Sequence, residues 1–531
     1  MTSKRGGHVV DGTGSPARRA DVGIRADRIT AVGDLAAEQA ATVIDAAGLV
    51  VSPGFIDVQG QSGTTLLVDG RGESHVRQGI TTEIIGEGSS PAFWSSVTAD
   101  AEPLKRMGVA FDWQGYDDYF AKLQKSGTAI NLGTLVPATT VRSEVIGLAE
   151  REPTPDELRR MEAMVDQAMR DGAFGLSCAL IYMPGSFAKT PELVALARVA
   201  ARHKGIYVSH VRGESFNLFT ALDEAIAIGR EAGLPVVVFH LKVAARANWG
   251  RMADAVKKLT DARAAGQQVS ATMYPYTAGG TRLAAVLPLW VQEGGTEKML
   301  ARLQDPATRA RVRQEVTTTT DGWENLLMAS TFEGIQVASV PEDYDRSVEG
   351  KTLAQLAAAR GQDPWDTLFE LVIGTKGRTG ALFHMMREDD VQTGLKAPFV
   401  TIGTDSAAIR TDGPLAQGQP HPRAYGTFPR VLGKYVREDK VLTLEDAVHR
   451  MTGLAASQFQ IRDRGLVKEG LFADLVVFDP ATVADTATYE KPHSYPRGIQ
   501  HVLVNGVPVV GPSGGLGAAP GRPLYGPGRA R

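Results

Sequence analysis

The spacing of apolar and polar residues predicts strands that alternate with helices. Segment 156–170 has a helical period, and its apolar face comprises Leu158, Met161, Val165 and Ala168. Short apolar runs typical of buried parallel strands lie at residues 50–58, 81–86, 129–136, 172–177, 206–210, 235–240, 269–274 and 399–405. Eight such strands in βα order predict an α/β fold, a (β/α)8 TIM-like barrel.

The two ends of the chain predict short strands and turns instead. Residues 21–32 form two runs broken by a polar turn, and Asn505-Gly506 is the dipeptide typical of a tight hairpin. Neither end has enough strands for a stable sheet, so we predict one small β-sandwich domain built from both termini. The predicted boundaries are 1–53 and 464–515 for this domain, 54–463 for the barrel and 516–531 for a flexible Gly-, Pro- and Arg-rich tail.

A long connection separates the seventh and eighth predicted strands. It spans roughly 120 residues, far more than an ordinary βα connection needs. Part of it, residues 297–304, has a helical pattern. We therefore predict an inserted subdomain at about residues 283–398.

Composition narrows the classes of function. The 57 Lys and Arg residues nearly balance the 60 Asp and Glu residues, so no basic excess favours nucleic acid or a membrane surface. The chain has neither an apolar stretch of about 20 residues nor a signal-peptide core. With one cysteine, Cys178, no intramolecular disulfide forms. We predict a cytoplasmic protein that acts on a small molecule; whether it forms a homo-oligomer is left open.

Candidate metal ligands stand at the ends of three predicted strands. His210 and His240 each close an apolar run, and Asp405 closes the eighth. In barrel enzymes the C-terminal ends of the strands carry the reactive residues, so this set predicts a metal-dependent hydrolase. Catalytic zinc usually has three protein ligands, and Glu87, between two glycines just past the second strand, is the candidate for the third.

Each of these residues also has a structural explanation. A single strand-end histidine more often serves packing, Asp405 suits a helix N-cap, and Glu87 suits a solvated loop. Two histidines and an aspartate on neighbouring strands favour the metal site nevertheless. Cys178 also ends a strand, but no acid–base partner lies near it in sequence, so we predict a buried structural thiol.

Nine short segments occur in an order typical of one enzyme family. They include Val-Ser-Pro-Gly-Phe-Ile-Asp at 51–57, His-Val-Arg-Gly-Glu at 210–214 and His-Pro-Arg-Ala-Tyr-Gly-Thr-Phe-Pro-Arg at 421–430. The others lie at 9–16, 79–82, 175–177, 240–242, 274–279 and 470–480. On these segments the chain resembles the D-aminoacylase (N-acyl-D-amino-acid deacylase) family of the amidohydrolase superfamily.

The resemblance implies a barrel with a small β domain and hydrolysis of an amide to a carboxylate and an amine. It implies zinc bound through His210 and His240, with Asp405 as the catalytic aspartate. It also places four residues where they line or support the substrate pocket: Lys242, Tyr182, Tyr274 and Arg212.

The chain departs from the family pattern on one side of the metal site. Gln59 and Gln61 stand where the family has paired histidines, Glu87 where it has a metal-bridging cysteine, and Gly280 where it has a small polar residue. The amide oxygen of glutamine is a neutral, weak zinc ligand. We therefore predict one zinc per chain, bound by Glu87, His210 and His240.

Roles for the remaining candidates follow from their chemistry. Asp405 is the predicted general base and then general acid. The oxyanion donor is Tyr182, Tyr274 or Gln61. Lys242 and Arg410 are candidate cations for a substrate carboxylate, although either also suits an ordinary surface charge.

Three functions remain open from the sequence. The first is deacylation of N-acyl-D-amino acids. The second is hydrolysis of a different amide, a dipeptide, a carbamate or a cyclic amide, which the glutamine pair and Gly280 favour. The third is a non-catalytic homologue.

Overall fold

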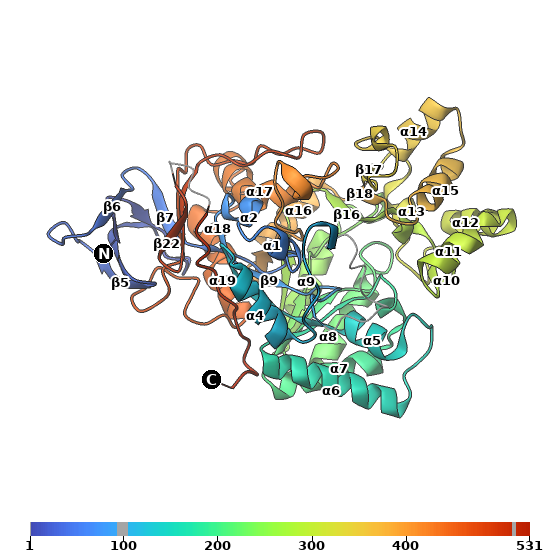
Figure 1. Cartoon of the computed structure of the whole chain (residues 1–531), viewed down its shortest axis with the longest axis horizontal. Coiled ribbons are helices and arrows are strands. Elements are labelled where there is room, and N and C mark those ends of the chain that lie inside the picture. Colours follow the sequence, from blue (N-terminus) through green and yellow to red (C-terminus); the bar gives the residue numbers. More distant parts are fainter. Residues whose placement is uncertain (1, 93–104, 512–516, 531) are drawn as a thin grey trace.

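A computed structural model describes residues 2–92, 105–511 and 517–530 (Figure 1). Parallel strands lie at its centre, with helices packed around them. Strands from the chain termini lie to one side, and a group of helices from residues 283–375 projects on the other. No helix in these ranges is long and apolar enough to cross a membrane.

Each of the eight predicted apolar runs overlaps a central parallel strand. These are β8 (Phe55–Asp57), β9 (Ile80–Ile85), β10 (Asn131–Thr134), β12 (Gly175–Ala179), β13 (Ile206–His210), β14 (Val236–Val238), β15 (Val269–Met273) and β19 (Val400–Ile402). The α/β fold is confirmed, because the neighbouring strands pair in parallel.

The hydrogen bonds divide these strands into two sheets. One has the order β10-β9-β8, and the other runs β11-β12-β13-β14-β15-β19, with β11 at Val136–Pro137. Backbone hydrogen bonds join the two sheets at both sides. Asp405 N donates to Gln59 O at 2.8 Å and Gln61 N to Ser406 O at 3.0 Å, and Phe174 N donates to Thr134 O at 2.8 Å. A fully closed barrel remains a prediction.

Amphipathic helices cover the central strands. Helix α6 (Pro155–Asp171) begins at a Thr154 capping box and ends at Gly172, with Met161 and Val165 buried as predicted. The others are α1 (Thr65–Val68), α2 (Glu73–Val76), α4 (Tyr116–Ser126), α5 (Ala138–Ile146), α7 (Thr190–Arg202), α8 (Leu218–Ala232), α9 (Met252–Ala264), α16 (Glu388–Lys396), α17 (Arg423–Arg430), α18 (Leu444–Met451) and α19 (Gly453–Gln458).

Strands from both ends of the chain share one sheet, in the order β22-β21-β20-β7-β2-β3. Their bounds are β2 (His8–Val9), β3 (Arg18–Arg19), β7 (Val50–Pro53), β20 (Leu475–Phe478), β21 (Ile499–Val504) and β22 (Val507–Val510). Asn505 and Gly506 have φ of 48° and 78°, as the predicted hairpin requires.

A second sheet packs on the first and has the order β5-β4-β1-β6. It comprises β1 (Thr2–Arg5), β4 (Asp21–Arg25), β5 (Arg28–Gly33) and β6 (Thr42–Asp45), with β4 and β5 forming the predicted hairpin. Val22 and Ile24 from this sheet share a buried cluster with Val9, Leu475 and Leu503 from the other. The proposed C-terminal boundary of this region near residue 515 lies outside the described residues.

The long connection between β15 and β19 has a core of its own. Its helices are α10 (Leu289–Gln292), α11 (Thr296–Gln304), α12 (Pro306–Thr318), α13 (Leu326–Ser330), α14 (Leu353–Arg360) and α15 (Pro364–Gly374). The helix predicted at 297–304 is α11. An antiparallel sheet β16-β18-β17 was not predicted; it comprises β16 (Ala278–Arg282), β17 (Ile335–Ser339) and β18 (Gly380–His384).

The chain end contradicts the predicted flexible tail. Backbone hydrogen bonds join Leu524 N to Leu132 O at 2.8 Å and Gly526 N to Gly172 O at 2.7 Å. A Cβ atom on Gly521 would lie 2.0 Å from Ile130 O, so the glycine is needed for close packing of two backbones. A glycine-rich composition predicts disorder, but here the glycines allow two backbone segments to pack closely.

Candidate metal site and substrate cavity

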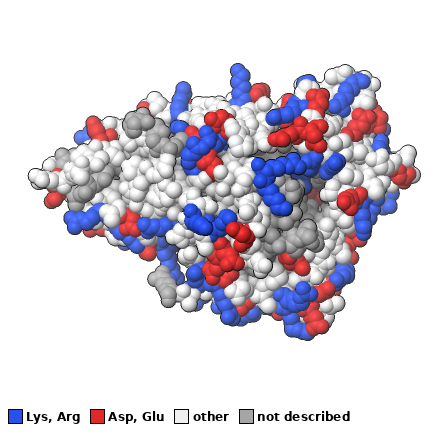
Figure 2. Space-filling model, in the orientation of Figure 1, with Lys and Arg blue, Asp and Glu red and all other residues white. Residues whose placement is uncertain are grey.

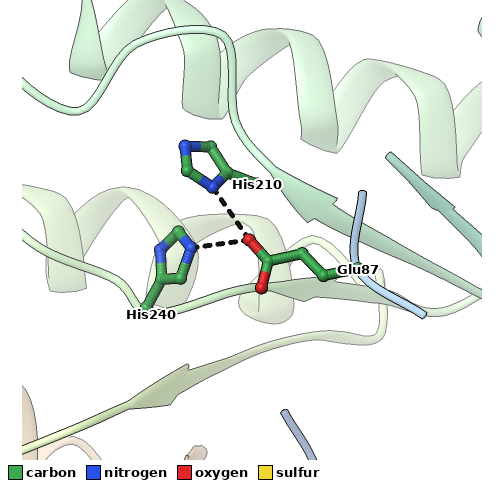
Figure 3. A group of neighbouring side chains, drawn as sticks. All are labelled: Glu87, His210 and His240. Carbon is green, nitrogen blue, oxygen red and sulfur yellow. Dashed lines mark hydrogen bonds and ion pairs between the residues drawn. The ribbon is translucent and has the colours of Figure 1, made fainter. Parts of the chain in front are cut away.

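Glu87, His210 and His240 lie together at the C-terminal ends of the central strands (Figure 3). Glu87 Oε1 is 2.9 Å from His210 Nδ1 and 3.0 Å from His240 Nε2, and all three side chains are buried. Burial favours the protonated carboxyl, but the two imidazoles outweigh it and hold the pKa of Glu87 well below its usual range. The cluster therefore presents one carboxylate and two imidazole nitrogens within 4.8 Å of one another.

The second oxygen of Glu87 is held by the glutamine pair. Gln59 Nε2 and Gln61 Nε2 each donate to Glu87 Oε2 at 3.0 Å. The amide oxygen of Gln59 is also satisfied, because it accepts from Thr272 Oγ1 at 2.6 Å and from His240 N at 3.2 Å. Both glutamines thus present N–H donors toward the metal cluster, where the family has imidazoles.

A buried carboxylate, Glu214, lies on the other side of His240. Its Oε1 is 2.9 Å from His240 Nδ1 and 2.5 Å from Lys242 Nζ. Burial opposes ionisation, but Lys242 and the histidines lower the pKa of Glu214 below its usual range. An ionised Glu214 accepts the Nδ1 proton of His240 and so leaves Nε2 free as a metal donor.

Asp405 follows β19 with φ of 49°, in the left-handed region that non-glycine residues rarely adopt. The backbone bond to Gln59 O fixes this conformation, and Gln61 Nε2 donates to Asp405 Oδ1 at 3.4 Å. On the opposite side, Arg423 Nη1 is 2.8 Å from Asp405 Oδ2. Burial raises the pKa of Asp405 above its ordinary value, while Arg423 opposes the rise.

These groups open on one cavity of about 480 Å³. Its polar lining includes the metal cluster, Asp405, Lys242, Arg423, Gln61, Tyr182 and Tyr274, and its apolar lining includes Ile181, Leu326, Phe383 and Met385. The hydroxyl of Tyr274 is buried and has no hydrogen-bond partner in the described part of the chain. A ligand in the cavity can therefore use this hydroxyl.

Two predicted substrate-binding residues do not line this cavity. Arg212 donates to both carboxylate oxygens of Glu224 and to the carbonyl oxygens of Ser186 and Ala188, which fixes the loop after β12. Arg410 forms ion pairs with Asp69 at 3.1 Å, Glu73 at 3.5 Å and Asp412 at 2.6 Å.

Cys178 is buried between Tyr207 and Ser209 and lies outside the cavity lining. Burial raises the pKa of its thiol to about 11. The thiol is therefore protonated at neutral pH, which suits the structural role that we predicted for it.

Sequence reasoning missed Glu214 and Arg423 as site residues. Both lie in segments that carry the family resemblance, 210–214 and 421–430. Their inclusion in those segments was the only sequence feature that pointed to them, because neither follows a strand directly.

Comparisons with known proteins agree with this geometry. Residues 42–510 match the amidohydrolase family. The chain belongs to this family. It is 36% identical to a D-aminoacylase from Alcaligenes xylosoxydans xylosoxydans over 95% of this chain and 93% of that protein.

Two solved structures are similar over 99% of both chains, each with a TM-score of 0.82. One is an N-acyl-D-glutamate deacylase from Bordetella bronchiseptica, 34% identical, in complex with zinc and a phosphonate mimic of the tetrahedral intermediate. The other is a D-aminoacylase, 37% identical, whose binuclear metal centre is described by one-metal activation and second-metal attenuation.

The residues of this chain fit a zinc ion. Glu87, His210 and His240 supply the oxygen and nitrogen donors that zinc takes, and Glu214 orients one imidazole for metal binding. Three protein donors leave a position open, as in catalytic zinc sites.

Proposed function

We propose that this amidohydrolase is a zinc-dependent enzyme that removes the acyl group from N-acyl-D-amino acids. The observation that carries the proposal is the convergence of Glu87, His210 and His240 with Asp405 on one cavity. Hydrolysis of an amide needs an electrophile, a proton carrier and space for the substrate, and this cavity brings them together. Similarity to D-aminoacylase and N-acyl-D-glutamate deacylase supports the substrate class.

We propose one zinc per chain, bound by Glu87, His210 and His240. The glutamine pair supports this number, because two N–H groups already satisfy the second oxygen of Glu87. A second cation in that position would face amide donors in place of ligands. When bound, zinc supplies Lewis-acid chemistry, polarising a carbonyl and making water more acidic.

Asp405 carries the proton in this proposal. Its carboxylate lies at the cavity wall, where it removes a proton from the attacking water and returns it to the leaving amine. Gln61 and Arg423 hold one oxygen each, which fixes the carboxylate in the cavity. The raised pKa of Asp405 brings its basicity closer to that needed near neutral pH.

Four other groups bind and orient the substrate. Arg423 and Lys242 are the buried cations of the cavity and suit the α-carboxylate of an amino acid. The Tyr274 hydroxyl has no hydrogen-bond partner among the described residues, and its ring centroid lies 4.6 Å from Arg423 Cζ and 5.5 Å from Lys242 Nζ. Tyr182 packs edge-on against His210 and lines the same cavity, and its hydroxyl is the proposed oxyanion donor.

The test compares hydrolysis of paired N-acetyl-D- and N-acetyl-L-amino acids by the zinc-loaded protein. The measured quantity is the rate at which the free amine is released. The proposal expects turnover of the D substrates and at least a tenfold lower kcat/KM for their L partners. Turnover of cyclic amides or dipeptides without turnover of N-acyl-D-amino acids would refute the proposed substrate class. A metal-loaded protein inactive on all of these substrates would refute the proposed activity.

A further inference from the structure

Three basic side chains line the catalytic cavity: Lys242, Arg282 and Arg423. Lys242 forms an ion pair with Glu214 at 2.5 Å, and Arg423 forms one with Asp405 at 2.8 Å. Arg282 differs from both, because its side chain is exposed and forms no ion pair or hydrogen bond with any described residue.

The position of Arg282 is fixed by its strand. Strand β16 pairs with β18 through all five of its residues, from Ala278 opposite His384 to Arg282 opposite Gly380. Burial decreases along β16, since Ala278 is fully buried and Arg282 is exposed. The strand therefore runs from the cavity interior to its rim, and Arg282 marks the outer end. Figure 2 shows Lys and Arg side chains along the border of a hollow on this face, near the position of β16 in Figure 1.

Gly280 keeps the path between the interior and the rim open. A Cβ atom there would lie 3.4 Å from Leu382 and 3.7 Å from Arg423 Nη2. The absence of a side chain thus leaves space beside Arg423. A substrate whose α-carboxylate is bound by Arg423 can extend along β16 toward Arg282.

The charges of the cavity favour an anionic group at that outer end. The interior anions Glu87, Glu214 and Asp405 already have partners among the histidines, Lys242 and Arg423. Arg282 remains as the cavity cation without an ion-pair partner among the residues that the structure describes, and a guanidinium binds a carboxylate through two parallel hydrogen bonds. The wall toward the insertion includes the apolar side chains of Leu326 and Phe383.

We propose that Arg282 binds a second carboxylate of the substrate, so that the enzyme prefers N-acyl amino acids with a carboxylate beyond the α-carboxylate. This inference rests on the proposed deacylase function. The second carboxylate belongs either to the amino-acid side chain, as in glutamate, or to the end of the acyl group, as in a succinyl group. Both sources present the same chemistry to Arg282.

The test compares matched charged and neutral substrates. N-acetyl-D-glutamate against N-acetyl-D-glutamine tests the side chain, and N-succinyl-D-alanine against N-butyryl-D-alanine tests the acyl group. We expect kcat/KM of the native holoenzyme to favour the charged member of one pair by about tenfold. Arg282→Gln should remove this preference by raising KM for the charged substrate, with kcat and the neutral substrate unchanged.

Three further measurements keep the result specific. Arg282→Lys should retain part of the preference, because a charge remains but the paired donor geometry is lost. Arg25→Gln is the matched control, since Arg25 is another exposed arginine at a strand end and lies in the terminal β region. In the native protein the preference should also weaken as salt rises, because the ion pair is exposed.

Three outcomes would overturn the inference. The native enzyme could favour neither charged substrate, the preference could be insensitive to salt and to Arg282→Gln, or Arg282→Gln could slow charged and neutral substrates equally. Each of these leaves deacylation itself intact. Failure to hydrolyse any N-acyl amino acid would overturn both the inference and the function on which it rests.

Discussion

Glu214→Gln tests how the protein prepares its metal site. The change keeps the size of the side chain and removes the charge that accepts from His240 Nδ1 and neutralises Lys242. Without that carboxylate, His240 loses the partner that directs its free nitrogen toward Glu87, and a buried ammonium next to the cluster repels a cation. We expect zinc affinity to fall while Glu87, His210 and His240 remain in place.

The size of the effect follows from these two contacts. Removal of a carboxylate that orients a metal-binding histidine typically lowers metal affinity by about 10–100-fold, or roughly 1.4–2.7 kcal/mol. The upper end is expected here, because Lys242 lies only 2.7 Å from His240 Nδ1 and loses its counter-ion. Zinc affinity is measured by competition with a chelator of known affinity, at constant pH.

Glu192→Gln is the matched control for this change. Glu192 is also a buried carboxylate paired with a buried cation, Arg142, but it lies outside the cavity lining. Both variants lose one buried ion pair, so both should unfold at lower temperature. Only Glu214→Gln should bind zinc more weakly. Native zinc affinity in Glu214→Gln, or equal losses in the two variants, would refute a role for Glu214 in orienting His240.

Four further predictions concern the same site. His210→Ala and His240→Ala should lose zinc, by metal analysis, and turnover together; an active variant without zinc would contradict the ligand assignment. Asp405→Asn should keep zinc and lower kcat by about 10²–10⁴-fold, and a loss of only a few-fold would show that another group carries the proton. Asp405 is active as the carboxylate, and burial raises the pKa of this group. As the pH is lowered, kcat/KM of the native enzyme should therefore fall at a pH above the ordinary aspartate pKa of about 3.9. Gln59→His with Gln61→His should raise metal content above the native level, and unchanged content would count against a vacated metal position.

The metal cluster could be predicted from sequence because its geometry is set by strands. His210 and His240 are placed by adjacent parallel strands that end at the same level. Glu87 follows β9 by two residues. Apolar runs locate such strand ends well, so the residues just beyond them can be inferred without knowing the loops.

The arginine at the cavity could not be predicted in the same way. Arg410 lies in the irregular segment after Asp405 and Arg423 begins helix α17, and the sequence does not show which of them returns to the cavity. The structure directs Arg410 toward Asp69 and Arg423 toward Asp405. Loop paths depend on such long-range contacts, which leave no periodic pattern in the chain.

The chain end was mispredicted for a related reason. Glycine and proline allow both disorder and close backbone packing, and composition does not separate the two. Contact between Leu524 and Leu132 depends on a strand almost 400 residues earlier in the sequence.

The most direct test of the account is a zinc titration of the metal-free protein, with N-acetyl-D-amino acid hydrolysis followed at each step. The account predicts that activity rises in proportion to bound zinc and reaches its maximum at one zinc per chain. Full activity without metal, or a maximum that requires two zinc ions per chain, would contradict it.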